Sequence, residues 1–423
     1  MNFKSDFLRE FFARGFFAQA THSKELDEIL AHESVTAYIG FDCTAKSLHA
    51  GSLIQIMILR LLQKHGHRPI VLLGGGTSKI GDPSGKDEAR QILTNEKIQE
   101  NLSGIHKTLA KFISFEGDNG AILANNDDWL KNLNYLDFLR DIGRHFSVNR
   151  MLTFDSVKLR LERDQPLSFL EFNYMILQAY DFYELNKKHG CRLQIGGSDQ
   201  WGNIVNGAEL TRRLGANSDP LAQRCGLHQT FGLTSPLLTT ADGKKMGKTA
   251  DGAVWLDAEM LSPFDYFQYF RNVDDRDVGK FLRLFTDLEL SEIEEMEKLK
   301  DQETNKAKER LAFETTKICH GEKIAEEILQ KAREIFVSKS SAAFEVKEIF
   351  LGTENNNKLG KKLVEIIREI GAAESNSEAK KLISGKAVRI NEELVLDANF
   401  LIEKIGDFNL FVGKKKFFKI SVK

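Results

Sequence analysis

The hydrophobic pattern near the start of the chain switches between strand-like and helix-like periods. Residues 36–41 (TAYIGF) form a short β-type run, and Leu53, Ile56 and Leu61 then recur at helical spacing. Residues 69–73 (PIVLL) are continuously apolar, as expected of a strand that is buried on both faces. Strand, helix and strand in this order form a βαβ unit, which predicts a parallel sheet with helices on both faces.

The pattern changes character along the chain. Residues 192–195 (RLQI) are a further strand candidate that leads into a Gly-Gly turn. Beyond residue 249 the pattern becomes helical. Ser262 caps a helix that has proline at its first position, and Asp274 and Ser291 begin two more helices in similar style.

These shifts predict an α/β fold with several domains. We expect a Rossmann-like catalytic domain with a parallel sheet at 1–249, with N-terminal helices and an inserted segment near 120–165. A helical domain at 250–337 follows, then a linker at 338–357 that is rich in Ser and Asn, and a small α+β domain at 358–423.

Composition narrows the class of protein. With 42% hydrophobic and 28% charged residues and a net charge of −2, the chain can bury a core and is neither disordered nor basic overall. Cys43, Cys191, Cys225 and Cys319 form no CxxC pair, so neither a zinc site nor a disulfide framework is indicated. No apolar run is long enough to cross a membrane, and charges interrupt the N-terminal apolar positions. We therefore expect a soluble, cytoplasmic protein.

Charge is distributed unevenly. Residues 358–423 carry fourteen Lys and Arg against nine Asp and Glu, a net of +5 that leaves −7 for the rest. A basic module on an acidic body hints at a polyanionic partner, but on charge alone a solvated lysine face is the favoured explanation.

The first candidate motif is His49-Ala-Gly51-Ser52, at the start of the helix that follows the first strand. Such a helix start offers free N–H groups and a positive dipole end to phosphates. Alone the motif is weak, because a histidine that merely caps its helix gives the same pattern.

The second motif is the glycine-rich stretch at 74–85 with Asp82, Lys86 and Arg90. Its spacing is not that of a Walker A loop. It gathers a carboxylate and two cations after a buried strand, where open α/β sheets bind ligands; an ordinary flexible turn is the alternative.

The third motif is Asp242-Gly-Lys-Lys245-Met-Gly-Lys248-Thr249. Lysines on a loop flanked by glycines can close over a leaving pyrophosphate. By itself this segment is also explained as a solvated run of charge.

Taken together, the first and third motifs resemble the HIGH and KMSKS signatures of class I aminoacyl-tRNA synthetases. Between them, residues 169–181 (FLEFNYMILQAYD) and 194–203 (QIGGSDQWGN) resemble the bacterial tyrosyl-tRNA synthetases. Residues 358–423 resemble an S4 RNA-binding module. The resemblance covers the whole chain.

The resemblance implies a tyrosine pocket. Tyr38 and Asp181 match the pair that contacts the phenol oxygen, and tyrosine-specific synthetases are the established example of rejecting phenylalanine in this way. Tyr174 and Gln178, with Asp82, match the groups that hold the ammonium. Residues 174, 178 and 181 are spaced i, i+4 and i+7, so one helix face presents them together.

The resemblance also implies the chemistry. The tyrosine carboxylate attacks the α-phosphorus of ATP, which arrives with Mg²⁺, and no tightly bound cofactor or protein metal site is expected. Because this nucleophile is already ionised, catalysis must come from orientation and from cations that meet the developing charge. The residues matched to phosphate and leaving-group chemistry are Thr44, His49, Lys86, Arg90, Lys245 and Lys248, and those matched to ATP binding and the substrate carboxylate are His49, Gly51, Ser52, Asp199, Gln200, Lys248 and Thr249. Ser52 replaces the second histidine of HIGH, and Cys43 stands where proline is common.

The partners implied are L-tyrosine, tRNA(Tyr) and a second copy of the chain, in a homodimer formed through the inserted segment, with no membrane. In the S4-like module we expect a first helix near residues 363–367, a second helix at 378–384 with a capping box at 375–378, and a turn into a strand at 385–391. There Lys380, Lys381, Lys386 and Arg389 would face RNA phosphates.

Three other functions compete with this interpretation. A tryptophan-specific relative is disfavoured because an indole N–H only donates, which leaves the Tyr38 hydroxyl poorly matched. A small-molecule adenylyltransferase shares the helix start but needs no RNA modules. A synthetase-derived RNA-binding protein without catalysis is disfavoured by the presence of Asp82, Asp181, Lys245 and Lys248.

Overall fold

A computed structural model describes residues 2–80, 93–218, 229–243, 246–249, 252–336, 345–349, 360–391, 393–402, 406–413 and 416–422. The chain divides into two compact units, Met1–Glu326 and Glu327–Lys423. Among the described helices, none is long and apolar enough to span a membrane.

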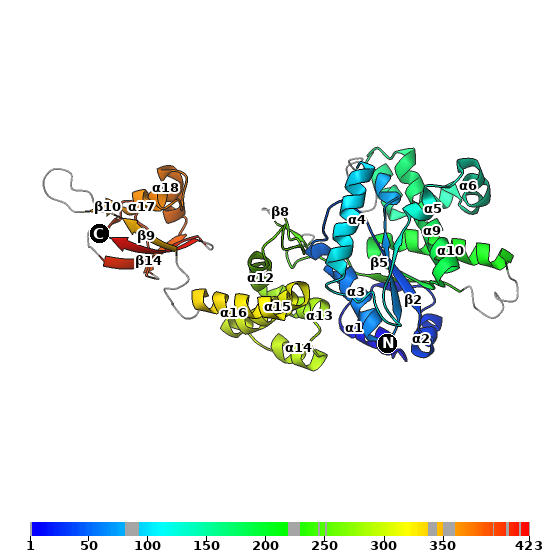
Figure 1. Cartoon of the computed structure of the whole chain (residues 1–423), viewed down its shortest axis with the longest axis horizontal. Coiled ribbons are helices and arrows are strands. Elements are labelled where there is room, and N and C mark those ends of the chain that lie inside the picture. The colour runs from blue at the N-terminus through cyan, green and yellow to red at the C-terminus, as the bar shows by residue number, and fades with distance from the viewer. Residues whose placement is uncertain are drawn as a thin grey trace. The chain divides into compact units, whose positions relative to one another are not determined.

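The first unit is built on a six-stranded sheet in the order β1-β6-β5-β2-β3-β4 (Figure 1). Its strands are β1 (Gln19–Ala20), β2 (Thr36–Phe41), β3 (Arg68–Leu73), β4 (Ile122–Asn125), β5 (Leu193–Gly197) and β6 (Phe231–Ser235). All neighbouring pairs are parallel except β1 with β6. The predicted βαβ unit and parallel sheet are confirmed.

Helices flank this sheet, with α3 and α4 on one side and α9 and α10 on the other (Figure 1). The helices of the first unit are α1 (Asp6–Ala13), α2 (Ser23–His32), α3 (Leu53–Lys64), α4 (Asn95–Leu109), α5 (Asp127–Leu130), α6 (Tyr135–Asp141), α7 (Val148–Met151), α8 (Asp155–Glu162), α9 (Phe169–His189), α10 (Trp201–Ser218), α12 (Pro263–Arg271), α13 (Val278–Phe285), α14 (Leu290–Glu297) and α15 (Thr304–His320), and α16 (Glu322–Phe336) contains the boundary between the units. Short 3₁₀ turns are η1 (Ala50–Ser52), η2 (Thr77–Lys79), η3 (Gly143–His145), η4 (Ser198–Gln200), η5 (Asp275–Asp277) and η6 (Asp301–Glu303).

The sheet core explains why β2 and α9 lie together. Successive residues of a strand point to opposite faces, so Tyr38, Ile70 and Leu72 share one face. This face packs on Phe182 and Leu185 of α9 in one buried cluster. The strand order runs outward in both directions from β2 and β5, which makes the β2–β5 boundary the topological switch point, where such sheets bind ligands.

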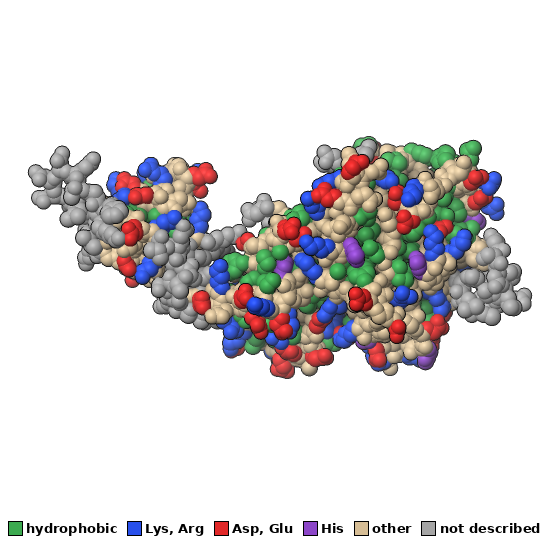
Figure 2. All heavy atoms as spheres, viewed as in Figure 1, with side chains coloured by type: hydrophobic (Ala, Val, Ile, Leu, Met, Phe, Trp, Pro, Cys, Tyr) green, Lys and Arg blue, Asp and Glu red, His purple; other side chains and the backbone are tan. Residues whose placement is uncertain are grey.

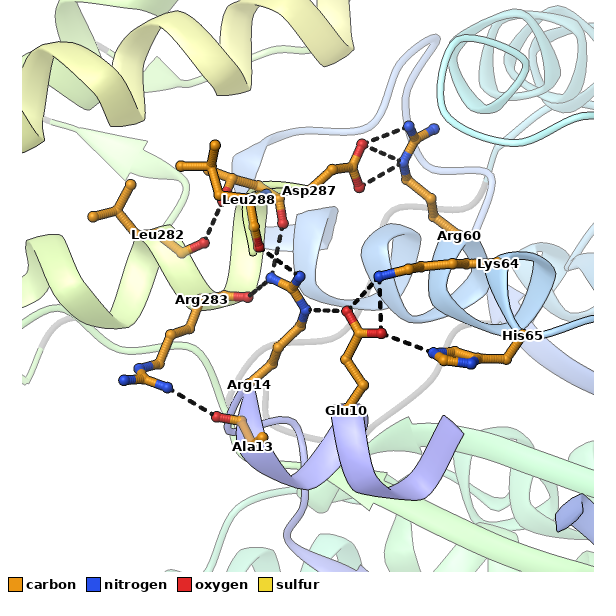
Figure 3. Close-up of polar contacts among 11 residues, drawn as sticks. Glu10, Ala13, Arg14, Arg60, Lys64, His65, Leu282, Arg283, Asp287 and Leu288 are labelled. Carbon is orange, nitrogen blue, oxygen red and sulfur yellow. Dashed lines mark hydrogen bonds and ion pairs between the residues drawn. The ribbon is translucent and has the colours of Figure 1, made fainter. Parts of the chain in front are cut away.

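A polar network fastens α1 to the rest of the unit (Figure 3). The buried Arg14 donates to the carbonyls of Arg283, Thr286 and Leu288, at 3.1, 3.0 and 2.9 Å, and binds Glu10 at 2.7 Å. The guanidinium of Arg14 therefore donates to carbonyl oxygens at and just beyond the end of α13, where the helix itself supplies no donors.

In its described residues, the second unit contains two small sheets, helices α17 and α18, and the end of α16. A five-stranded sheet has the order β12-β11-β14-β15-β9, and β10 pairs with β13. The elements are β9 (Glu345–Ile349), β10 (Lys361–Lys362), α17 (Leu363–Glu369), α18 (Asn376–Ser384), β11 (Val388–Ile390), β12 (Glu393–Leu394), β13 (Leu401–Ile402), β14 (Gly406–Val412) and β15 (Lys416–Val422). The expected helix, helix and strand of an α+β domain are all present.

Four details of the sequence interpretation were wrong. Strand β9 lies inside the predicted linker at 338–357 but pairs in parallel with β15. Strand β4 lies inside the predicted insertion near 120–165 but pairs with β3 as part of the main sheet. Helix α14 has Glu289, not Ser291, at its N-cap. Helix α18 begins at Asn376, directly after the capping Ser375, rather than at Glu378.

A short strand pair begins at the end of the third motif. Strands β7 (Lys248–Thr249) and β8 (Gly252–Ala253) pair antiparallel, and α12 begins after Ser262 as predicted, with the Ser262 side chain accepting a hydrogen bond from Asp265 N.

Candidate active site

A cleft with a cavity volume of about 290 Å³ opens at the carboxyl end of β2 and β5, on the switch point of the sheet. Tyr38 of β2 and Gln194 of β5 are direct neighbours in register and both line it. Helix α9 supplies Tyr174, Gln178 and Asp181 to the same cleft, so the prediction that one helix face presents these three side chains together is confirmed.

The inner end of the cleft is built around a buried carboxylate. Asp181 is 2% exposed. Its Oδ1 accepts a hydrogen bond of 2.7 Å from Nε1 of Trp129, and its Oδ2 accepts one of 2.9 Å from Nδ2 of Asn126. Two donors therefore hold this carboxyl group in one orientation.

Burial sets the proton affinities at this end. Desolvation raises the pKa of Asp181 to about 7, although the hydrogen bonds from Asn126 and Trp129 lower it. Burial and the nearby charge of Asp181 raise the pKa of Tyr38 well above its ordinary value. Tyr38 therefore stays a neutral hydroxyl at physiological pH, while Asp181 is poised between its two protonation states.

Four buried polar atoms on the cleft wall have no hydrogen-bond partner in the described part of the chain. They are the hydroxyl of Tyr38 and the side-chain carbonyl oxygens of Gln55, Gln178 and Gln194. Buried polar groups normally have a hydrogen-bond partner, because leaving such a group unpaired costs about 1–3 kcal/mol. A phenol at the inner end would supply an acceptor oxygen for the Tyr38 hydroxyl, whereas the glutamine oxygens call for donors on the rest of a ligand.

The first and third motifs meet in space. His49 accepts a hydrogen bond from Gly51 N at 3.0 Å through its Nδ1, so it caps its own turn. A Cβ atom on Gly247 would lie 2.4 Å from Gly51 N and 2.8 Å from His49 Nδ1, and the φ of Gly247 is +97°. Only glycine fits at this contact, which joins the helix start to the lysine motif across some two hundred residues of sequence.

The structure gathers about half of the predicted site residues. Those that line the cleft are Tyr38, Gly51, Tyr174, Gln178, Asp181, Asp199 and Gln200. Thr44, His49 and Ser52 do not line it: Thr44 is exposed on the turn after β2, and the other two are half-buried at η1. Asp82, Lys86, Arg90 and Lys245 lie outside the described residues, as do the side chains of Lys248 and Thr249.

Sequence reasoning missed several contributors to the cleft. Asn126 and Trp129 donate hydrogen bonds to Asp181. Thr77 accepts a hydrogen bond from Asn126 at 2.9 Å. Gln194 lies beside Tyr38 on the neighbouring strand. Only Asn126 had a usable signal, since it directly follows β4 at the carboxyl edge of the sheet. In the described part of the chain, no group of three or more His, Cys, Asp or Glu side chains is placed to hold a metal ion.

Comparison with known proteins identifies the family. Residues 30–337 match the family described as class I tRNA synthetases (W and Y), and residues 361–408 match the S4 domain. The chain is 57% identical to a tyrosine–tRNA ligase of Ehrlichia ruminantium (strain Welgevonden), over 99% of both chains. It is 56% identical to one of Wolbachia pipientis subsp. Culex pipiens (strain wPip), over 100% of this chain and 99% of the relative.

The chain belongs to the tyrosine–tRNA ligase family. Among solved structures, a C-terminally truncated mitochondrial tyrosyl-tRNA synthetase of Aspergillus nidulans is 31% identical, with a TM-score of 0.69 over 78% of this chain and 94% of that one. A tryptophanyl-tRNA synthetase of Encephalitozoon cuniculi has a TM-score of 0.53 at 12% identity, over 77% of this chain and 91% of that one. The fold is thus shared by tyrosine- and tryptophan-specific enzymes.

Proposed function

We propose that the cleft binds L-tyrosine with its phenol hydroxyl between Tyr38 and Asp181, and that the chain there carries out both steps of a tyrosine–tRNA ligase. The observation that carries this assignment is the buried, unpartnered hydroxyl of Tyr38 beside the buried carboxyl group of Asp181. The phenol O–H donates to Asp181, and its oxygen accepts from Tyr38. Phenylalanine leaves both groups unmatched.

The other end of the substrate is directed toward the mouth of the cleft. Tyr174 and Gln178, with Asp82, hold the ammonium group, and the Gln178 carbonyl oxygen, which has no partner among the described residues, suits a cationic donor. Gln200 contacts the substrate carboxylate and Asp199 the ribose of ATP. The carboxylate then lies next to the α-phosphorus and needs no general base, because it is already ionised.

The cations of the second and third motifs carry the leaving-group chemistry. Thr44 and His49 contact the transferring phosphate, and Lys86, Arg90, Lys245 and Lys248 neutralise pyrophosphate as it departs. Gly51, Ser52 and Thr249 contribute to the ATP site, and Mg²⁺ enters with ATP as part of the substrate. In the second step the terminal ribose hydroxyl of tRNA(Tyr) attacks the tyrosyl-adenylate.

RNA binding involves both the helical domain and the S4 domain. Lys380, Lys381, Lys386 and Arg389 are all exposed in the second unit. Cations of this kind bind phosphates in a salt-dependent and largely sequence-independent way.

The proposed domain limits are 1–249 for the catalytic domain and 250–337 for the helical domain. We place the protein in the cytoplasm, where its tRNA is.

The chain acts as a homodimer formed through the segment between α5 and α9. Exposed large apolar residues gather there: Tyr135, Leu136, Leu139, Val148, Leu152, Leu161, Phe169 and Leu170, of which Leu136 is 73% and Phe169 68% exposed. Hydrophobic side chains are visible on the surface around α6 (Figure 2). A surface of this kind is typical of an interface between copies.

The direct test is ATP–pyrophosphate exchange with tyrosine, tryptophan or phenylalanine as substrate, followed by charging of tRNA(Tyr). Exchange and charging with tyrosine alone are expected. Exchange that prefers tryptophan would refute the assignment of the pocket, and binding of tRNA without any exchange would leave only an RNA-binding function.

A further inference from the structure

The segment that leads into the lysine motif is held by the helical part of the first unit. Nζ of Lys280 donates to the carbonyl oxygen of Thr239 at 2.7 Å, and the N–H of Ala241 donates to Oδ2 of Asp277 at 2.8 Å. Arg276 pairs with Asp242 at 3.1 Å. Residues of η5 and the first turn of α13 thus hold three of the four residues from 239 to 242.

Asp277 uses its side chain in an unusual way for its position. It is the N-cap residue of α13, where an aspartate ordinarily accepts from N–H groups of its own helix. Its side chain makes no such cap bond and instead accepts from Ala241, 36 residues earlier. Asp277 is also 4% exposed. Burying a carboxylate costs free energy. Because the buried carboxylate of Asp277 binds a backbone N–H far away in the sequence, we assign it a role other than helix capping.

Residues that follow this held segment contact the first motif. After residues 244 and 245, the chain reaches Met246 and Gly247, and Met246 N donates to the carbonyl of Leu238 at 3.1 Å. Gly247 packs against Gly51 and His49 so closely that it has no room for a side chain. The position of residues 238–242 is therefore coupled, through Leu238 and Met246, to the way the Gly247 turn sits on the start of the His49 helix, where Val254 N also donates to the Gly247 carbonyl oxygen.

Helix α13 is itself a fixed support. Its carboxyl end is anchored by Arg14, which donates to the carbonyls of Arg283, Thr286 and Leu288 (Figure 3). Its amino end presents Asp277 and Lys280 to the segment before the lysine motif. The helix thus links the N-terminal α1 to the backbone of that segment.

We propose that Asp277 is a positioning residue for tyrosine activation. Through Ala241 it places the Gly247 turn against His49 and Gly51, and it touches no substrate. This inference rests on the proposed function and adds to it a residue of the helical domain that acts on the ATP end of the cleft. The phenol end, built by Tyr38 and Asp181, is independent of it.

The test compares Asp277→Ala, Asp277→Asn and Thr315→Ala in the full-length chain. Asparagine keeps an acceptor oxygen for Ala241, whereas alanine has none. Thr315 is a matched control, since its buried hydroxyl bonds only to carbonyls of its own helix α15. The readouts are kcat and KM for ATP in pyrophosphate exchange, the Kd of tyrosine without ATP, and the melting temperature.

Asp277→Ala is expected to lower kcat/KM for ATP about tenfold or more, as loss of a hydrogen bond to a charged group would. The Kd of tyrosine should stay within about twofold, Asp277→Asn should recover most of the loss, and Thr315→Ala should match the wild type. If Asp277→Ala does not fold, Lys280→Met removes the neighbouring bond to Thr239 and is expected to raise KM for ATP several-fold.

Equal kinetics for Asp277→Ala and Thr315→Ala, or an equal loss of tyrosine binding and ATP use, would overturn the inference. If Lys280→Met has to stand in, unchanged kinetics for that variant would overturn it too. A wild-type protein that shows no tyrosine-dependent exchange would instead refute the proposed function, so the two failures are distinct.

Discussion

Nε1 of Trp129 donates a 2.7 Å hydrogen bond to Oδ1 of Asp181, from a residue 52 positions away in the sequence. This bond fixes the carboxyl group beside the hydroxyl of Tyr38 and favours its ionised form. In the proposed tyrosine pocket, the orientation of Asp181 therefore depends on Trp129, which does not itself line the cleft.

Replacing Trp129 with Phe removes the indole donor while keeping an aromatic ring. Because the lost bond favours the carboxylate, the pKa of Asp181 should rise further and its carboxylate should accept the phenol proton less well. We expect KM for tyrosine to rise about tenfold. Lys188→Met is the control, since it removes the cation over the Trp129 ring and the ion pair of Lys188 with Glu184 but no hydrogen bond to Asp181, and it should behave nearly as the wild type. Equal KM values for the two variants would contradict this role.

The raised pKa of Asp181 has a sign that stability measurements can check. The folded-state pKa of Asp181, about 7, lies above the ordinary 3.8. The stabilising contribution of Asp181 to the free energy of unfolding is therefore fully present below pH 3.8 and is lost as the pH rises through 7. Asp181→Asn does not titrate there. Without tyrosine, the unfolding free energy of Asp181→Asn relative to wild type should increase between pH 4 and 8, by a few kcal/mol. Urea unfolding across this range measures it, and a constant difference would refute the shift.

Arg14 is expected to be important for the stability of the first unit. Arg14→Met keeps the apolar stem but leaves the carbonyls of Thr286 and Leu288 without this donor and Glu10 without its closest cation. Removing one partner of a buried ionic contact costs about 3–5 kcal/mol. Urea denaturation should show a loss of this order, whereas Arg9→Met, on the exposed side of the same helix, should change little.

We predict that the proposed homodimer depends on the exposed apolar residues from α6 to the start of α9. Leu136→Asp places a charge in the proposed interface and should yield monomers in sedimentation equilibrium. Met260→Asp alters an exposed apolar residue in the helical part and should leave the dimer intact. Dimers of unchanged stability in Leu136→Asp would mean that this face is not the interface.

Local patterns in the sequence predicted the parts of the site that lie on single elements. The spacing of Tyr174, Gln178 and Asp181 gave their common helix face, and the apolar runs gave β2 and β3. The bond from Trp129 to Asp181 could not be predicted, because Trp129 lies in the segment whose sequence indicates an insertion, and Asn126 could be found only if β4 is recognised as a strand. Its strand β4 is short and lies at the sheet edge, where its apolar pattern is weak.

A similar reason explains strand β9. Its residues Glu345–Ile349 are flanked by stretches rich in Ser and Asn, which favoured a linker, yet the strand pairs in parallel with β15 some seventy residues later. Parallel pairing of this kind is non-local and leaves no mark in a window of neighbouring residues. The Tyr38 hydroxyl has no hydrogen-bond partner among the described residues, and this too could not be predicted, because it depends on tertiary packing.

The central claim is that Tyr38 and Asp181 recognise the phenol hydroxyl, and the most direct test is kcat/KM in pyrophosphate exchange for tyrosine and for phenylalanine, in wild type and Tyr38→Phe. The wild type should strongly prefer tyrosine. Tyr38→Phe should lower kcat/KM for tyrosine about tenfold, because one hydrogen bond is lost, and leave that for phenylalanine nearly unchanged. An equal fall for both amino acids, or no change for either, would contradict the account.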